Sequence, residues 1–132
     1  MGGRPPGTRK QRDARSLTTP APARGAWAED AAVRRLEAAG LRVLARNWRC
    51  RGGELDVVAR DRDGTLVFVE VKQRATDGYG SAAEHLVARK AALVRRAALQ
   101  YMGRDDLRCR FDAVLVSGTE ARHSLEWLKD AF

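Results

Sequence analysis

Residues 53–60 read GELDVVAR and residues 66–72 read LVFVEVK, and these two stretches decide the fold of the chain. Apolar side chains alternate with other side chains along both stretches, and this period of two predicts two β-strands. The intervening residues 61–65 read DRDGT, which is typical of a turn in which Gly64 adopts a positive φ. The two stretches are therefore expected to form an antiparallel hairpin that is central and largely buried.

The length of the turn determines which side chains meet across this hairpin. A loop of three or of five residues places Asp56 opposite Glu70. The same register places Glu54 opposite Lys72, so that three carboxylates and one amine share a face. A four-residue loop would instead divide them between the two faces.

Buried carboxylates persist only when they are paired, protonated or bound to a cation. We therefore expect Lys72 to neutralise one carboxylate of the hairpin and a divalent metal ion to accommodate the others. Mg²⁺ is commonly bound through one or two carboxylates together with several waters. The alternative interpretation is a solvated strand end that carries a surface ion pair.

Composition and charge indicate one globular domain with a basic tail. The chain has 132 residues, 44% of them apolar, and a formal net charge of +8. Residues 1–24 contain six basic residues against one acidic residue and all four prolines, so we expect a disordered tail followed by a domain over 25–132. Such a charge favours a polyanion partner, although a basic tail without function remains the alternative. With no apolar span and no secretion signal, a cytoplasmic protein without membrane contact is expected.

The other segments predict an α/β fold with the order αβββαββ. The expected elements are a helix over 25–39, a strand over 41–49, the two hairpin strands, a helix over 81–102, and strands over 110–117 and 124–128, the last at an edge. Three consecutive strands in a meander are antiparallel, whereas a helical crossover joins two parallel strands. We therefore expect a mixed central sheet flanked by helices.

Three more side chains are candidates for a site, each with two interpretations. Glu29 lies in the first turn of the first helix, where it either stabilises the helix dipole or points at the hairpin. Lys90 lies on the apolar side of the second helix, where it either extends outward to water or reaches an anionic site. Arg49 belongs to a glycine-bearing connection that either contacts phosphate or is a plain hairpin loop.

An Asp on the second strand and Glu-x-Lys on the third, in this order of elements, resemble the restriction-endonuclease-like PD-(D/E)XK nuclease fold. The pattern is more closely similar to the YraN family of uncharacterised bacterial proteins. The matching residues are Gly25, Glu29, Ala32, Gly40, Asn47, Arg49, Gly53 to Asp56, Phe68 to Lys72, Arg74, Gly80, Lys90, Arg110 to Asp112, Ala131 and Phe132. The resemblance covers residues 25–132 and leaves the tail unmatched.

Within this fold the Holliday-junction resolvases look most similar, and they carry a further Glu on the first helix. The resemblance therefore implies that Glu29 joins Asp56 and Glu70 as an active-site carboxylate. It implies a Mg²⁺- or Mn²⁺-dependent DNA endonuclease in which Asp56, Glu70 and the Val71 carbonyl hold the metal, with Glu29 as an additional ligand. Lys72 would orient or help to deprotonate the attacking water.

If the chain is such a nuclease, we expect Arg49, Arg74, Lys90 and the basic tail to hold the DNA backbone. No base-reading element is evident, so structure-selective or non-specific recognition is expected, and two-fold dimers among resolvases leave a homodimer open. The Pro that usually precedes the Asp is absent, and Glu54 stands nearby as an additional candidate acid with an open role. The alternatives are a non-catalytic nucleic-acid-binding accessory protein in DNA processing or uptake, and a structural protein.

Overall fold

The computed structural model describes the backbone of residues 23–74 and 80–132, and the side chains of residues 26–73 and 90–132. Its elements are α1 (Ala23–Ala38), β2 (Arg42–Cys50), β3 (Gly53–Arg60), β4 (Leu66–Arg74), α2 (Gly80–Met102), β5 (Cys109–Gly118) and β6 (His123–Leu128). This is the predicted order αβββαββ, with every boundary within two residues of its expected place. The predicted tail lies outside the described residues, except that its last two residues already belong to α1.

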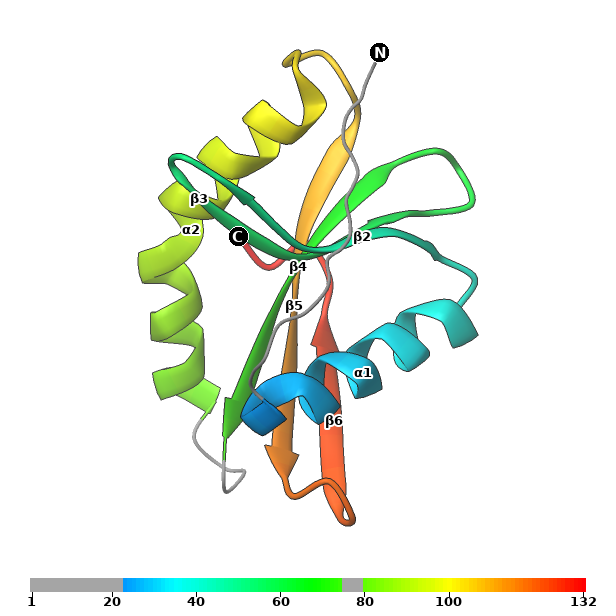
Figure 1. The fold of residues 1–132 in the computed structure, drawn as a ribbon, viewed down its shortest axis with the longest axis vertical. Helices are drawn as coiled ribbons and strands as arrows, with labels where there is room; N and C mark the ends of the chain where they lie inside the picture. The colour runs from blue at the N-terminus through cyan, green and yellow to red at the C-terminus, as the bar shows by residue number, and fades with distance from the viewer. Residues whose placement is uncertain (1–22, 75–79) are drawn as a thin grey trace.

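The sheet is mixed, as the order of elements predicts. Its strands lie in the order β2-β3-β4-β5-β6, with β6 at an edge as expected (Figure 1). The meander β2-β3-β4 is antiparallel, β4 and β5 are parallel, and β5 and β6 are antiparallel. The parallel pair is joined by α2, because parallel neighbours need a long crossover connection. The fold is the mixed α/β arrangement that the nuclease-fold resemblance implies.

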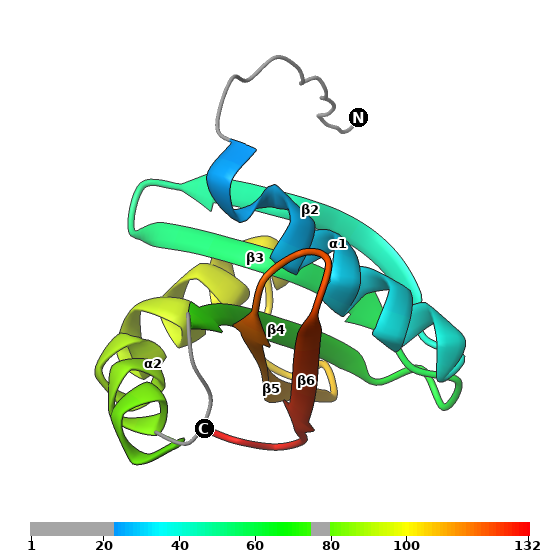
Figure 2. The same cartoon turned by 90° about the horizontal axis from the view of Figure 1, so that it is seen from below.

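The two helices cover opposite faces of the sheet, and alternation along β4 supplies a core to each (Figure 2). Val67 and Val69 pack in the cluster that contains the apolar face of α1. Leu66 and Phe68 pack in the cluster that contains the apolar face of α2. Successive strand residues point to opposite faces, so Glu70 and Lys72 continue the α2 side of β4.

The β3–β4 loop has the five residues that bring the acids into register. Arg60 pairs with Leu66, and the Asp61 N–H closes the loop by donating to the Thr65 carbonyl at 2.9 Å. Gly64 adopts a φ of 92°, as the turn composition predicts. The ladder ends at the pair Val57 and Val69, so that Asp56 and Glu70 are the first residues beyond it.

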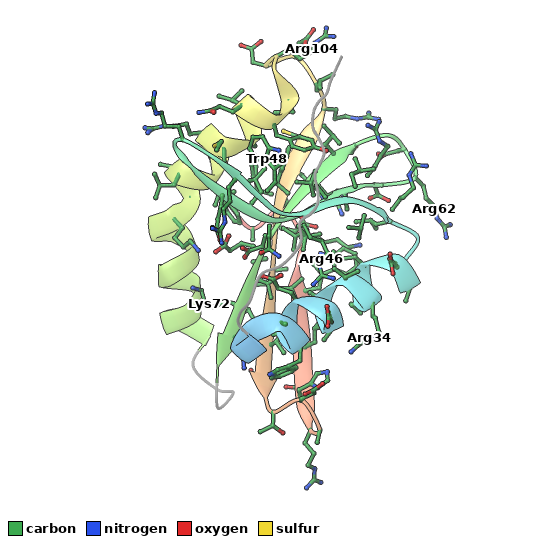
Figure 3. The ribbon with its side chains drawn as sticks, in the orientation of Figure 1. Arg34, Arg46, Trp48, Arg62, Lys72 and Arg104 are labelled. Carbon is green, nitrogen blue, oxygen red and sulfur yellow. The ribbon has the colours of Figure 1, made fainter. Side chains whose placement is uncertain are left out.

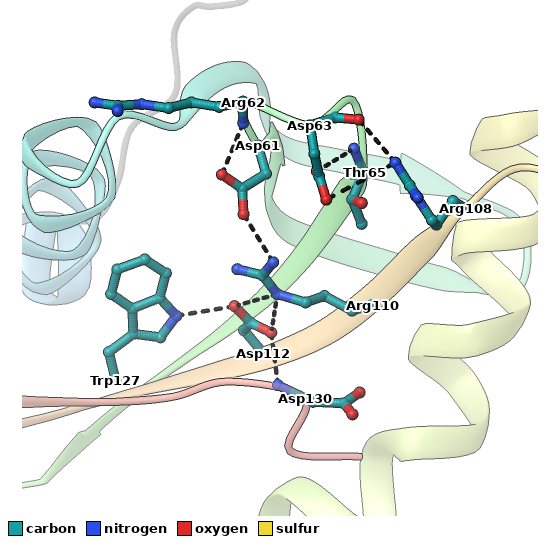
Figure 4. A network of polar contacts seen from close by, with 9 residues as sticks. All are labelled: Asp61, Arg62, Asp63, Thr65, Arg108, Arg110, Asp112, Trp127 and Asp130. Carbon is teal, nitrogen blue, oxygen red and sulfur yellow. Dashed lines mark hydrogen bonds and ion pairs between the residues drawn. The ribbon is translucent and has the colours of Figure 1, made fainter.

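A buried acid that the sequence analysis did not single out as a site holds the C-terminal segment against β5 (Figure 4). The Asp112 side chain is fully buried and accepts hydrogen bonds from Arg110 Nε at 3.1 Å, the Trp127 indole at 2.9 Å and the Asp130 N–H at 2.8 Å. Arg110 also donates to Asp61 of the β3–β4 loop at 2.8 Å. The network therefore fastens two chain segments to β5, and its signal in the sequence is a carboxylate within an apolar strand.

Neither described helix combines the length and the apolar character needed to cross a membrane.

Candidate active site

Asp56 lies where β3 separates from β4, and its carboxylate replaces a backbone partner there. Its Oδ2 accepts a hydrogen bond from the Val71 N–H of β4 at 2.9 Å. The N–H and C=O of one strand residue point to the same neighbouring strand, so the Val71 carbonyl is directed to this side as well. Asp56 and Glu70 are 8% and 2% exposed, which makes them a buried acidic pair at the point of separation.

The ion-pair partner of Glu70 is Lys90, so Lys90 reaches an anionic site, which was the second of its two interpretations. The expectation that Lys72 neutralises a carboxylate of the hairpin is wrong for the described side chains. The Lys90 ammonium donates to Glu70 Oε2 from α2. Helix α2 can reach the site because it runs close to the start of β3, where a Cβ on Gly53 would lie 3.2 Å from the Leu93 carbonyl oxygen. Burial alone would lower the pKa of Lys90, but the hydrogen bond and the charge of Glu70 outweigh it and raise the pKa.

Lys72 remains available for another task. It extends from β4 on the side of α2 (Figure 3) and is half-buried. No hydrogen bond or ion pair joins it to another residue among those whose side chains the structure describes. Its ammonium is therefore not occupied in neutralising Glu70.

Glu29 belongs to the same acidic neighbourhood, although it comes from α1. The helix begins at Ala23, so the expectation that Glu29 lies in its first turn is wrong. Its Oε1 accepts from Asn47 Nδ2 at 3.1 Å and lies 3.6 Å from Arg46 Nη2. Burial raises the pKa of Glu29 in spite of these two partners. The charge of Glu29 in turn contributes to raising the pKa of Asp56, so the two carboxylates lie close enough to repel each other.

Asn47 is a site residue whose role the sequence did not reveal, because it stood only among the residues that match the family pattern. The structure keeps it in β2 with a φ of 52°, between the pairs Arg46–Val57 and Trp48–Leu55. Asn adopts this left-handed conformation more readily than most residues. The left-handed Asn47 lies across from Asp56. At the same point β3 changes the face to which its side chains point, because Leu55 packs on the α2 side but Val57 packs on the α1 side.

The remaining predicted residues lie at the rim of the site or outside the described side chains. Arg49 Nε lies 3.3 Å from Glu54 Oε1, and both side chains are well exposed. The charge of Glu54 contributes to raising the pKa of Glu29 and of Lys90, which places this acid beside the site. The side chain of Arg74 is not among those described, so its predicted contact with DNA stays a prediction.

Comparison with known proteins identifies the family. A model of the uncharacterised protein family UPF0102 matches residues 28–116. The chain belongs to this family. The UPF0102 protein of Paracidovorax citrulli (strain AAC00-1) is 51% identical over 90% of this chain and 87% of its own length. The UPF0102 protein of Dechloromonas aromatica (strain RCB) is 50% identical over 83% of this chain and 88% of its own length. UPF0102 is the YraN family, so the family expected from the sequence is confirmed.

Two solved structures are similar at a lower level. A repair endonuclease from Pyrococcus abyssi aligns with a TM-score of 0.44 and 24% identity, over 78% of this UPF0102 chain and 42% of that chain. The EndoMS–dsDNA2 complex aligns with a TM-score of 0.38 and 20% identity, over 76% of this chain and 39% of that chain. Neither alignment carries the assignment of the fold, which rests on the element order and strand pairing described above.

The donors of the UPF0102 site fit a hard divalent cation in type, since Asp56 and Glu70 offer carboxylate oxygens and Val71 a carbonyl. Across the described residues, no three acidic, His or Cys side chains form a group that could hold a metal ion. A cation here would therefore be held directly by two carboxylates at most, which suffices for Mg²⁺ with waters completing its coordination. Glu29 would contact it only through water.

The buried pair makes stability depend on pH in a definite direction. The pKa of Asp56 is raised from 3.8 to about 7, first by burial and second by the charge of Glu70, while the Val71 N–H opposes the shift. The folded protein thus holds this proton more tightly than the unfolded chain, and the stabilisation is lost as pH rises between these two values. In EDTA, we expect wild-type stability relative to Asp56→Asn to fall by up to roughly 4 kcal/mol from about pH 4 to about pH 7.

Urea denaturation of both proteins across this range measures the difference. Asn keeps an oxygen acceptor for the Val71 N–H but cannot ionise, so it is the matched control. A difference that is flat, or that grows in favour of the wild type as pH rises, would contradict the raised pKa.

Proposed function

We propose that this UPF0102 protein is a divalent-metal-dependent DNA endonuclease that hydrolyses phosphodiester bonds. The observation that carries the proposal is the buried pair of Asp56 and Glu70 where β3 leaves β4. Only one described lysine, Lys90, pairs with these acids, and Asp56 remains without an ion-pair partner among the described side chains. A buried acidic pair with too little counter-charge is costly for folding, and such a cost is typical of a site built for a cation.

Asp56, Glu70 and the Val71 carbonyl would hold Mg²⁺ or Mn²⁺, with Glu29 acting through water. When bound, such an ion supplies polarisation of the scissile phosphate and activation of water. Asn47 and Arg46 fix the carboxylate of Glu29 by two contacts from β2, so Glu29 is oriented before any substrate arrives. The Val71 N–H fixes Asp56 in the same way.

Lys72 is the residue we assign to the attacking water and to the charge of the phosphate. It lies two residues beyond Glu70 on the same face of β4, and no described side chain engages its ammonium. An ammonium in this position can orient water and offset the negative charge that develops at the phosphoryl group. This division of roles, with Lys90 on Glu70 and Lys72 without a partner among the described side chains, supports catalysis over a purely structural ion pair.

DNA is the proposed substrate because the chain has a net charge of +8 and carries basic side chains at the rim of the site. Arg49 is 76% exposed and Lys90 is 42% exposed, so both can meet a phosphate backbone. Arg74 and the basic residues 1–24 are assigned to the same backbone contacts from sequence. We propose structure-selective or non-specific recognition.

The experiment is incubation of the full chain with single-stranded, flapped, forked and four-way DNAs in Mn²⁺, with EDTA as the control. We expect at least one of these DNAs to be cleaved in Mn²⁺ and none in EDTA. Binding of DNA without cleavage of any member would favour the accessory-protein interpretation. If the protein neither binds nor cleaves any of these DNAs, a role on DNA is contradicted.

A further inference from the structure

The Glu70–Lys90 pair is asymmetric in its exposure to solvent. The Glu70 side chain is 2% exposed and fixed within the fold, whereas that of Lys90 is 42% exposed. The buried carboxylate has little room to move, but the ammonium can withdraw into water by rotation of a flexible stem. One partner of this ion pair is therefore permanent and the other is exchangeable.

The Lys90 ammonium lies among the carboxylates of the acidic site. It is bonded to Glu70, and the charges of Asp56 and Glu54 act on it as well. A divalent cation on Asp56 and Glu70 would need the carboxylate oxygen of Glu70 that Lys90 occupies, and an ammonium hydrogen-bonded to that carboxylate would repel the cation. The divalent cation and the Lys90 ammonium therefore compete for the Glu70 carboxylate.

We infer that Lys90 is a built-in competitor of the divalent cation: its ammonium neutralises Glu70 in the metal-free protein and is released when the cation binds. The inference rests on the proposed function and deepens it. Release leaves a free ammonium at the rim of a newly metal-loaded site, where a DNA phosphate is the available anion. Lys90 therefore couples loading of the metal to capture of the DNA backbone, while the metal-free site is kept stable.

The test is calorimetric titration with Mn²⁺ of the wild type, Lys90→Met and Lys72→Met. Lys90→Met keeps most of the apolar stem but removes the competing charge. We expect it to bind Mn²⁺ at least about tenfold more tightly than the wild type, which is about 1.4 kcal/mol. Lys72→Met is the matched control, because it removes the same charge from the same face without touching Glu70, and it should change the affinity by less than about threefold.

The outcomes separate this inference from the proposed function. If the wild type binds Mn²⁺ and Lys90→Met binds it equally or more weakly, the competition is wrong but the cation site stands. If Lys72→Met tightens binding as much as Lys90→Met, the effect is one of general charge and the inference is overturned. If none of the three proteins binds Mn²⁺, the cation site and the competition are both wrong.

A second measurement follows the wild-type protein itself, and variants serve only to assign its signals. The chain has four lysines, Lys10, Lys72, Lys90 and Lys129, so the ammonium signals of ¹⁵N-labelled protein can be assigned by single Lys→Arg changes. In metal-free protein we expect the Lys90 ammonium to be protected from exchange by its bond to Glu70. Saturation with Mg²⁺ should abolish that protection, and protection that persists in saturating Mg²⁺ would overturn the inference.

Discussion

Glu70→Gln is expected to lower DNA cleavage by roughly 10³-fold or more while leaving the free energy of unfolding within about 1 kcal/mol of the wild type. The change removes a charged oxygen donor without changing the shape of the side chain. Stability is retained because Lys90 is 42% exposed and can return to water. Asp56 is also relieved of the charge that is the second cause of its raised pKa.

Glu126→Gln is the matched control for this variant, since Glu126 is exposed on the edge strand β6 and lies outside the site. It should cleave DNA as the wild type does. Thermal melts with and without Mn²⁺ complete the comparison. Unchanged cleavage by Glu70→Gln would contradict its role as a ligand. If Glu70→Gln lowers the free energy of unfolding by roughly 3–5 kcal/mol and Mn²⁺ does not shift the melting temperature of the wild type, Glu70 and Lys90 are a structural ion pair instead.

Asp112→Ala is expected to destabilise the fold by roughly 3–5 kcal/mol, because it removes one partner of a buried ion pair. Arg110, the Trp127 indole and the Asp130 N–H would all lose their acceptor. One terminal nitrogen of Arg110 is already buried without a partner among the described residues, so the guanidinium has little remaining compensation. Urea denaturation followed by far-ultraviolet circular dichroism measures the effect without relying on Trp127 fluorescence.

Asp61→Asn provides the comparison for Asp112→Ala, because Asp61 meets the same arginine from the partly exposed side of the network. We expect it to cost no more than about 1 kcal/mol. A loss of similar size for both variants would mean that the Arg110 charge, and not the buried acceptor, holds the C-terminal segment.

The elements of this fold were predictable because their information is local. Alternation in β3 and β4 and the composition of residues 61–65 predict the hairpin, and the five-residue loop of the structure selects, from the registers left open, the one in which Asp56 meets Glu70. The length of α2 gave the parallel pair of β4 and β5. In each case a few neighbouring residues determine the outcome.

The partners of the buried charges were predictable only in part, because they depend on the path of distant segments: the sequence allows Lys90 to reach an anionic site but does not show which acid it meets. Lys90 lies 20 residues after Glu70 on another element, whereas Lys72, two residues after Glu70, is the partner that local spacing favours. Asp112 likewise finds its donors 15 and 18 residues later, in the segment after β5. Asn47 is of a residue type that tolerates the left-handed conformation, but nothing in its neighbourhood of the sequence shows that it adopts this conformation beside Glu29 and across from Asp56.

Calorimetric titration with Mn²⁺ of the wild type beside Asp56→Asn decides whether Asp56 and Glu70 form a site for a divalent cation. Asn keeps the shape and the acceptor for the Val71 N–H but lacks the charge. We predict one Mn²⁺ per chain for the wild type, and binding at least about tenfold weaker for Asp56→Asn. Absence of Mn²⁺ binding by the folded wild type, or equal binding by both proteins, would contradict the account.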